Sequence, residues 1–108
     1  MEKEYNKLVR DNIIDIIISN GEHPVYRELV GEEFWFYLLE KDIEELEEVR
    51  NAKSSEEVKK ELSDKLEILI AMANYHGFIL QDIIDAAEEK RNKNGGFDKK
   101  LFLEKVIE

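Results

Sequence analysis

The chain has 108 residues, of which 43% are apolar and 39% charged, and its 26 acidic and 16 basic residues give a formal net charge of −10. The apolar share is large enough for a packed core, which excludes a wholly disordered chain. The lack of cysteine excludes disulfides, thiolate zinc sites and cysteine nucleophiles. The negative charge argues against nucleic acid as a partner, because phosphate binding depends on clustered lysine and arginine.

The apolar runs are short, and none approaches the roughly 20 residues that a membrane-spanning helix needs. The opening MEKEYNKLVRDN mixes charges of both signs and has no apolar signal core. We therefore expect a cytoplasmic protein with no membrane partner, formed by a single domain over residues 1–108.

One proline and five glycines leave few break points, so the sequence predicts a mostly helical chain. The Ile-rich stretch near the N-terminus alternates too poorly for a half-exposed strand, and we interpret it as a helix that ends at Asn20-Gly21. An irregular segment follows over 22–31. The expected helices, in chain order, span residues 9–19, 32–51, from a cap at Ser54 or Ser55 to 76, and 80–93, with a short tail helix over 99–106.

The two longest expected helices are separated by a few residues only. Ser54 has an acidic capping-box partner three residues on, Glu57, which marks the start of the second of them. Gly77 and Gly95-Gly96 are the expected stops of the third and fourth helices. Long helices joined by a short loop pack as an antiparallel hairpin. The predicted fold class is all-α, a helical bundle built on this hairpin and completed by oligomerisation.

Each arm of the expected hairpin carries acidic residues on its apolar side. At 100° per residue, Glu45 falls inside the apolar arc of its helix, with Glu48 at the edge one turn on. Glu61 falls inside the arc of the next helix, with Asp64 at its edge. Oxygen-rich acidic clusters suit Mg²⁺ or Mn²⁺. In a chain this acidic such positions also arise by chance, and Lys65, which shares the arc, could pair with Glu61 or with an acid on another helix.

The E-x-x-E motif at Glu45–Glu48 and the E-x-x-D motif at Glu61–Asp64 resemble those of the MazG-type all-α nucleotide pyrophosphohydrolases. The segments YNKLVRDNI and KRNKNGGFDKKLFLE are similar to a MazG-like branch that itself resembles phosphoribosyl-ATP pyrophosphohydrolase, so the resemblance covers nearly the whole chain. It implies that Glu45, Glu48, Glu61 and Asp64 hold Mg²⁺, with Mn²⁺ as the alternative ion. It also implies a homodimer or homotetramer.

For the activity, the resemblance implies hydrolysis of a nucleoside triphosphate between its α- and β-phosphates, which gives a monophosphate and pyrophosphate. One alternative is the phosphoribosyl-ATP pyrophosphohydrolase of histidine biosynthesis. Another is a non-catalytic helical interaction module, in which the acidic residues serve solubility and pairing. Metal dependence separates the enzymes from the module.

Hydrolysis needs a base, for which Glu44 and Glu67 are the candidates. Because Glu44 and Glu45 are adjacent, the first motif can be read in two registers. Substrate phosphates also need cations, and Gly-Gly lets backbone N–H groups approach an anion. The alternatives are that the late basic residues complement a helix dipole and that Arg10 pairs with an acid on a neighbouring helix. The candidate substrate-binding residues are Lys7, Arg10, Lys90, Lys93, Gly95, Gly96 and Lys99.

Three consecutive aromatic residues, Trp35, Phe36 and Tyr37, lie near the start of the second expected helix. Aromatic side chains of this kind stack on nucleobases in some sites. They also supply large apolar area to cores and subunit contacts. We expect core or subunit contact in preference to base stacking.

Overall fold

A computed structural model describes all 108 residues of the protein. The fold is all-α, as the sequence predicts. No helix is both long enough and apolar enough to cross a membrane. The four helices, in chain order, are α1 (Ile13–Ser19), α2 (Gly31–Asn51), α3 (Ser55–Tyr75) and α4 (Leu80–Asn94).

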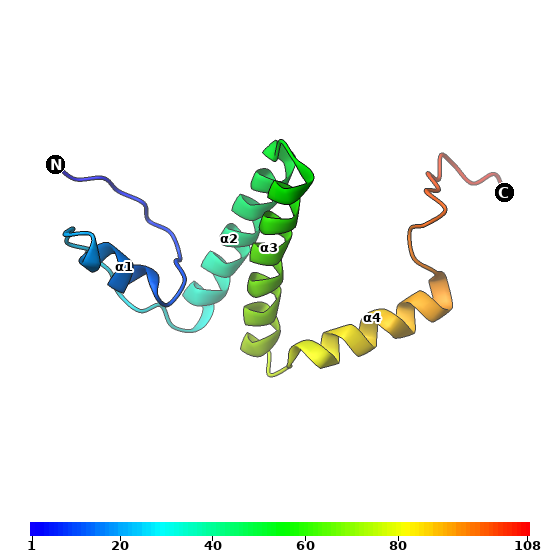
Figure 1. The fold of residues 1–108 in the computed structure, drawn as a ribbon. Coiled ribbons are helices and arrows are strands. Elements are labelled where there is room, and N and C mark those ends of the chain that lie inside the picture. Colours follow the sequence, from blue (N-terminus) through cyan, green and yellow to red (C-terminus); the bar gives the residue numbers. More distant parts are fainter.

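The centre of the molecule is formed by α2 and α3, two helices of 21 residues that lie side by side (Figure 1). All three buried apolar side chains, Leu38, Ile68 and Ala73, come from these two helices. Lys65 of α3 donates to Asp42 of α2 at 2.7 Å, so this lysine pairs with an acid on the other helix. These contacts fix how the two helices are turned toward each other.

Local signals in the sequence explain where the helices begin and end. The Ser54 hydroxyl accepts a hydrogen bond from the Glu57 backbone N–H at 3.2 Å, as expected for an N-cap. In a capping box the Glu57 carboxylate would accept a hydrogen bond from the backbone N–H of the N-cap residue Ser54. Here it accepts one from the backbone N–H of Lys53 instead. Gly77 follows α3 with φ +84° and Gly95 follows α4 with φ +85°, a conformation that favours glycine.

The structure corrects the expected start of the first helix, which is Ile13 rather than residue 9. The preceding residues, 1–12, hold no helix and are called here the N-terminal segment. Two ion pairs tie this segment to the central helices. Lys7 contacts Glu44 at 3.1 Å and Arg10 contacts Asp64 at 2.8 Å. The partners of these two ion pairs lie on different helices. We attribute the absence of a helix in the segment to these contacts, which outweigh the helical pattern of its sequence.

The structure also contradicts a tail helix over 99–106, where no helix is present. Lys100 adopts φ +57°, which a right-handed helix does not allow. Leu101 and Phe102 are 85% and 87% exposed, so the tail packs its apolar side chains against nothing in this chain. A helix of two turns needs such packing, because its own hydrogen bonds do not offset the cost of forming it.

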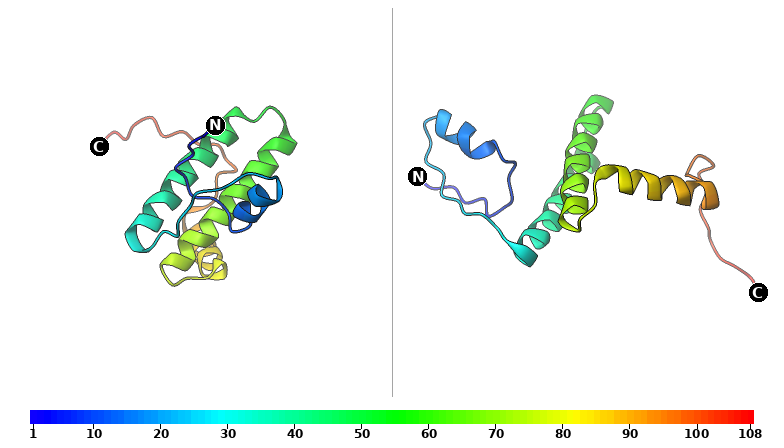
Figure 2. Two further views of the ribbon diagram at one scale, coloured as in Figure 1. Left: turned by 90° about the vertical axis from the view of Figure 1, so that its left-hand side faces the viewer. Right: turned by 90° about the horizontal axis from the view of Figure 1, so that it is seen from below.

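The N-terminal segment and α1 lie on one side of the α2–α3 pair, and α4 leads away on the other (Figures 1 and 2). The radius of gyration is 18.4 Å, against about 13 Å for a compact chain of this length. The accessible surface is 10149 Å², against about 6,300 Å² for a compact monomer of this mass. The single chain therefore leaves much of its apolar surface uncovered.

Candidate metal centre

Three carboxylates converge between the two central helices. One oxygen each of Glu45 on α2 and of Glu61 and Asp64 on α3 lies within 4.8 Å of the other two. We call these residues the acidic triad. Glu45 is the only buried charged residue of the chain, at 9% exposure, and its Oε2 atom is buried without a hydrogen-bond partner. A buried carboxylate oxygen without a partner is costly, and it requires an explanation.

The electrostatics of the triad favour a cation. Burial raises the pKa of the Glu45 carboxyl, and the neighbouring carboxylates of Glu61 and Asp64 raise it further, against a smaller opposing effect of Lys41. Both causes disfavour the ionised form of Glu45. A hard divalent ion would offset both effects, because it supplies the missing partner of the carboxylate oxygen and a charge of opposite sign. The all-oxygen donor set is the one that Mg²⁺ and Mn²⁺ prefer.

The helix geometry explains why the triad forms. Glu61 and Asp64 are three residues apart on α3, which puts them on one face about one turn apart. The packing of α2 against α3 then brings Glu45 opposite them. Glu48, the fourth predicted ligand, is exposed on α2 and is not part of the triad. The structure therefore brings together three of the four predicted ligands.

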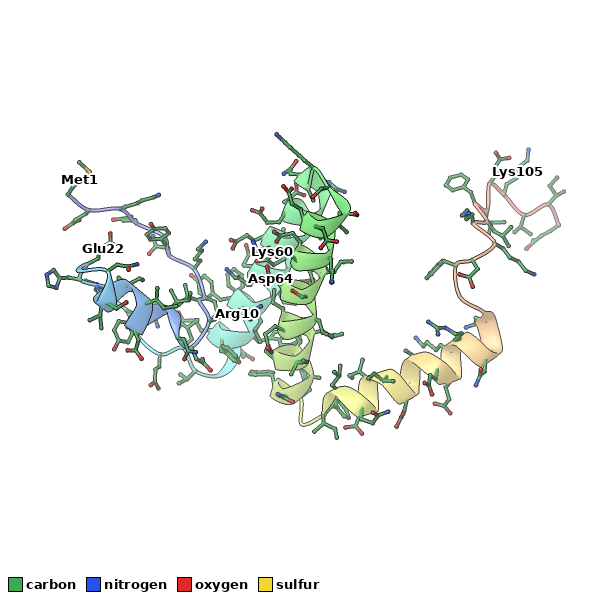
Figure 3. All side chains as sticks on the ribbon, in the orientation of Figure 1. Met1, Arg10, Glu22, Lys60, Asp64 and Lys105 are labelled. Atoms are coloured by element: carbon green, nitrogen blue, oxygen red, sulfur yellow. The ribbon has the colours of Figure 1, made fainter.

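The N-terminal segment brings one predicted substrate-binding cation, Arg10, to the triad and a second, Lys7, to Glu44 on α2. Arg10 donates to Asp64 Oδ1 at 2.8 Å, and Figure 3 shows these two labelled side chains next to each other. Lys7 donates to Glu44, which directly precedes Glu45 in α2, at 3.1 Å. The Arg10 side chain remains 55% exposed, so it is accessible from solvent.

The two candidate bases differ in their surroundings. Partial burial works against ionisation of Glu44, but hydrogen bonds and charges from Lys7 and Lys41 outweigh it and lower its pKa. Glu44 is thus an ionised anchor for the N-terminal segment, and a lowered pKa weakens a carboxylate as a base. Glu67 is exposed on α3, one turn beyond Asp64. Neither glutamate belongs to the triad.

The late basic residues and glycines lie elsewhere in this chain. Lys93 is on the last turn of α4, Lys90 is on the turn before it, and Gly95, Gly96 and Lys99 follow the helix. All five are exposed. The far end of α4 is directed away from α2 and α3 (Figures 1 and 2). Within one chain these residues are not brought to the triad.

One contributor to the site was missed by the sequence reasoning. Lys41 lies 3.5 Å from Glu44 and lowers the pKa of Glu45 against the stronger effects of the triad. Its spacing supplies a signal that could have found it, because residues four apart on a helix face each other and Lys41 precedes Glu45 by four.

Comparison of the chain with family models, curated proteins and solved structures finds no match.

Proposed function

We propose that the protein is a metal-dependent nucleotide pyrophosphohydrolase, which cleaves a nucleoside triphosphate between the α- and β-phosphates. The observation that carries this proposal is the unpartnered, buried Glu45 oxygen inside the acidic triad. The resemblance of the two acidic motifs to those of MazG-type enzymes supplies the reaction. The triad supplies an oxygen donor set suited to the ion that this reaction uses.

Glu45, Glu61 and Asp64 would hold Mg²⁺, or Mn²⁺ in its place. When bound, such an ion neutralises phosphate charge and lowers the pKa of a coordinated water. The chain's own part is to attract and orient the triphosphate despite a net charge of −10. Arg10 does this at the edge of the triad, because a guanidinium presents several N–H donors to phosphate oxygens.

The N-terminal segment acts as the phosphate-facing wall of the proposed site. Lys7 and Arg10 both belong to this segment, and each forms an ion pair with a carboxylate of the central helices. Glu44 serves as an anchor for this wall, since its pKa is lowered by the lysines that it holds. Glu67 is then the remaining candidate for the base that accepts a proton from the attacking water.

We also infer that a second copy of the chain covers an exposed apolar stripe on α2 and α3. The stripe consists of side chains that are each 38–51% exposed: Leu39, Leu46, Leu62, Leu66 and Leu69. Leu39 and Leu46 are seven residues apart on one helix, as are Leu62 and Leu69 on the other, so each set follows one face. Two such pairs would form a four-helix bundle. The surplus surface of the single chain exceeds the roughly 1,000–2,500 Å² that each subunit of an obligate homodimer buries.

Leu66→Lys is expected to weaken self-association. The side chain is 46% exposed in one chain, so lysine is tolerated there, but it would be buried unpaired between two copies. An unpaired buried charge costs about 3–5 kcal/mol, or at least about 100-fold in affinity. Sedimentation equilibrium should give two or four times the 12.8 kDa chain mass for the wild type and a smaller mass for the variant. Leu103→Lys, at a site 78% exposed in the tail, is the control, and an equal effect of both would contradict the stripe.

A nucleotide panel with Mg²⁺ tests the proposed activity. It includes the common ribo- and deoxyribonucleoside triphosphates together with phosphoribosyl-ATP, and it scores pyrophosphate separately from orthophosphate. The proposal predicts release of pyrophosphate and monophosphate from at least one compound, with no release in EDTA. Orthophosphate as the product would contradict cleavage between the α- and β-phosphates. No turnover of any compound would favour the interaction module.

A further inference from the structure

A cavity of about 390 Å³ lies between the N-terminal segment and α2. Its volume falls within the roughly 300–1,000 Å³ of small-molecule pockets. Three aromatic side chains line it, Tyr5 from the segment and Phe36 and Tyr37 from α2. The rings of Phe36 and Tyr37 meet edge to face with centroids 5.0 Å apart. The predicted aromatic group is thereby divided, since Trp35 instead stacks on Tyr75 of α3 at 5.3 Å.

The polar lining of this cavity offers both donors and acceptors. Asn6 and Glu40 both line it, and neither makes a side-chain hydrogen bond or ion pair within the chain. An amide carries two donor hydrogens and an acceptor oxygen, and a carboxylate carries acceptors only. Aromatic faces combined with an amide and a carboxylate suit a flat heterocycle with hydrogen-bonding edges.

The cavity and the acidic triad both adjoin α2 and the N-terminal segment. Lys7 and Glu44 line the cavity, and Glu44 directly precedes Glu45 of the triad in α2. The N-terminal segment then continues from the cavity to the triad, where Arg10 contacts Asp64. A single ligand with a flat ring at one end and phosphates at the other could therefore occupy both places.

We propose that this cavity binds the base of the nucleotide whose phosphates lie at the triad, which rests on the function proposed above. The base stacks on the aromatic lining, and its polar edge is read by Asn6 and Glu40. Tyr5 and Asn6 are thus specificity-determining residues carried by the N-terminal segment. Loss of one stacking side chain is expected to weaken base binding by about 5- to 150-fold.

Base binding can be measured without metal and without turnover. The full chain, labelled with ¹⁵N and kept in EDTA, is titrated with each nucleoside monophosphate and with ribose 5-phosphate as a base-free probe. Backbone amide shifts are expected at the cavity residues with the preferred nucleotide and to be absent there with ribose 5-phosphate. Equal shifts with both probes, or none at the cavity, would overturn the proposal.

Tyr5→Ala provides the matched variant, because Tyr5 is 62% exposed and its loss does not disturb the core. Tyr26→Ala is the control, since Tyr26 is 63% exposed and lies outside the cavity. Tyr5→Ala should weaken binding of the preferred monophosphate by at least about 5-fold and leave binding of ribose 5-phosphate unchanged. Tyr26→Ala should leave binding of both compounds unchanged. A second pair consists of Phe36→Ala, at a cavity site, and its control Phe78→Ala, outside the cavity. These two side chains are 53% and 50% exposed.

The two proposals fail in different ways. Base binding at the cavity without hydrolysis of any nucleotide in the panel would reject the pyrophosphohydrolase and keep the base site. Hydrolysis of a nucleotide with kcat/KM unchanged in both Tyr5→Ala and Phe36→Ala would reject the base site and keep the enzyme.

Discussion

Glu61→Gln and Asp64→Asn are each expected to reduce pyrophosphate release by more than about 100-fold, since even the residues that support metal ligands contribute about 10- to 100-fold. Each change keeps the size of the side chain and removes one anionic ligand of the triad. Both positions are on α3, and neither side chain is part of the apolar core. Helix content by circular dichroism should therefore match that of the wild type.

Glu47→Gln is the control for these variants. Glu47 is also a helical glutamate, on α2, with a side chain 55% exposed and paired only with Arg50. Its activity should equal that of the wild type. Turnover that is unchanged in both Glu61→Gln and Asp64→Asn would refute the triad as the metal centre, whatever the substrate.

Glu45→Gln is expected to stabilise the metal-free protein at neutral pH and to abolish its stabilisation by Mg²⁺. Burial and the two neighbouring carboxylates raise the pKa of Glu45 above its ordinary value of 4.5. The folded state therefore favours the protonated carboxyl, and it loses stability as the pH rises from the unfolded pKa through the higher folded pKa. A glutamine carries no charge at any of these pH values and escapes that loss.

Thermal unfolding of the wild type and of Glu45→Gln at pH 4 and pH 7.5 measures this effect. Without metal at pH 7.5 the variant should have a higher Tm than the wild type. The expected rise is roughly 4–8 °C for each kcal/mol by which its free energy of unfolding is greater. Near pH 4 the difference should shrink, because the wild-type carboxyl is then protonated. Mg²⁺ at 100 times its Kd should raise the free energy of unfolding of the wild type by about 2.7 kcal/mol and leave that of the variant almost unchanged. A variant less stable than the wild type at pH 7.5 without metal would contradict the buried, unpartnered state of Glu45.

The parts of the fold that follow from local signals could be predicted from the sequence. The bounds of α2, α3 and α4 agree with expectation to within a residue or two, because Ser54, Gly77 and Gly95 cap or stop them through short-range backbone effects. The fixed rotation of a helix likewise places Glu45, Glu61 and Asp64 on facing sides.

The N-terminal segment could not be predicted in the same way. Its conformation depends on Lys7 meeting Glu44 and Arg10 meeting Asp64, partners that are 37 and 54 residues away in the chain. A periodic pattern carries no information on such contacts. The cavity beside α2 was missed for the same reason, since one of its walls is this segment.

Calorimetric titration of the metal-free wild type and of Glu45→Gln with Mg²⁺ tests the central claim, that the acidic triad is built to hold a divalent ion. The wild type should bind at a saturable site, with protons released if the Glu45 carboxyl is partly protonated beforehand. Glu45→Gln should lose this site, while Glu47→Gln should keep it. Absence of Mg²⁺ and Mn²⁺ binding in the wild type, or equal binding in all three proteins, would contradict the claim.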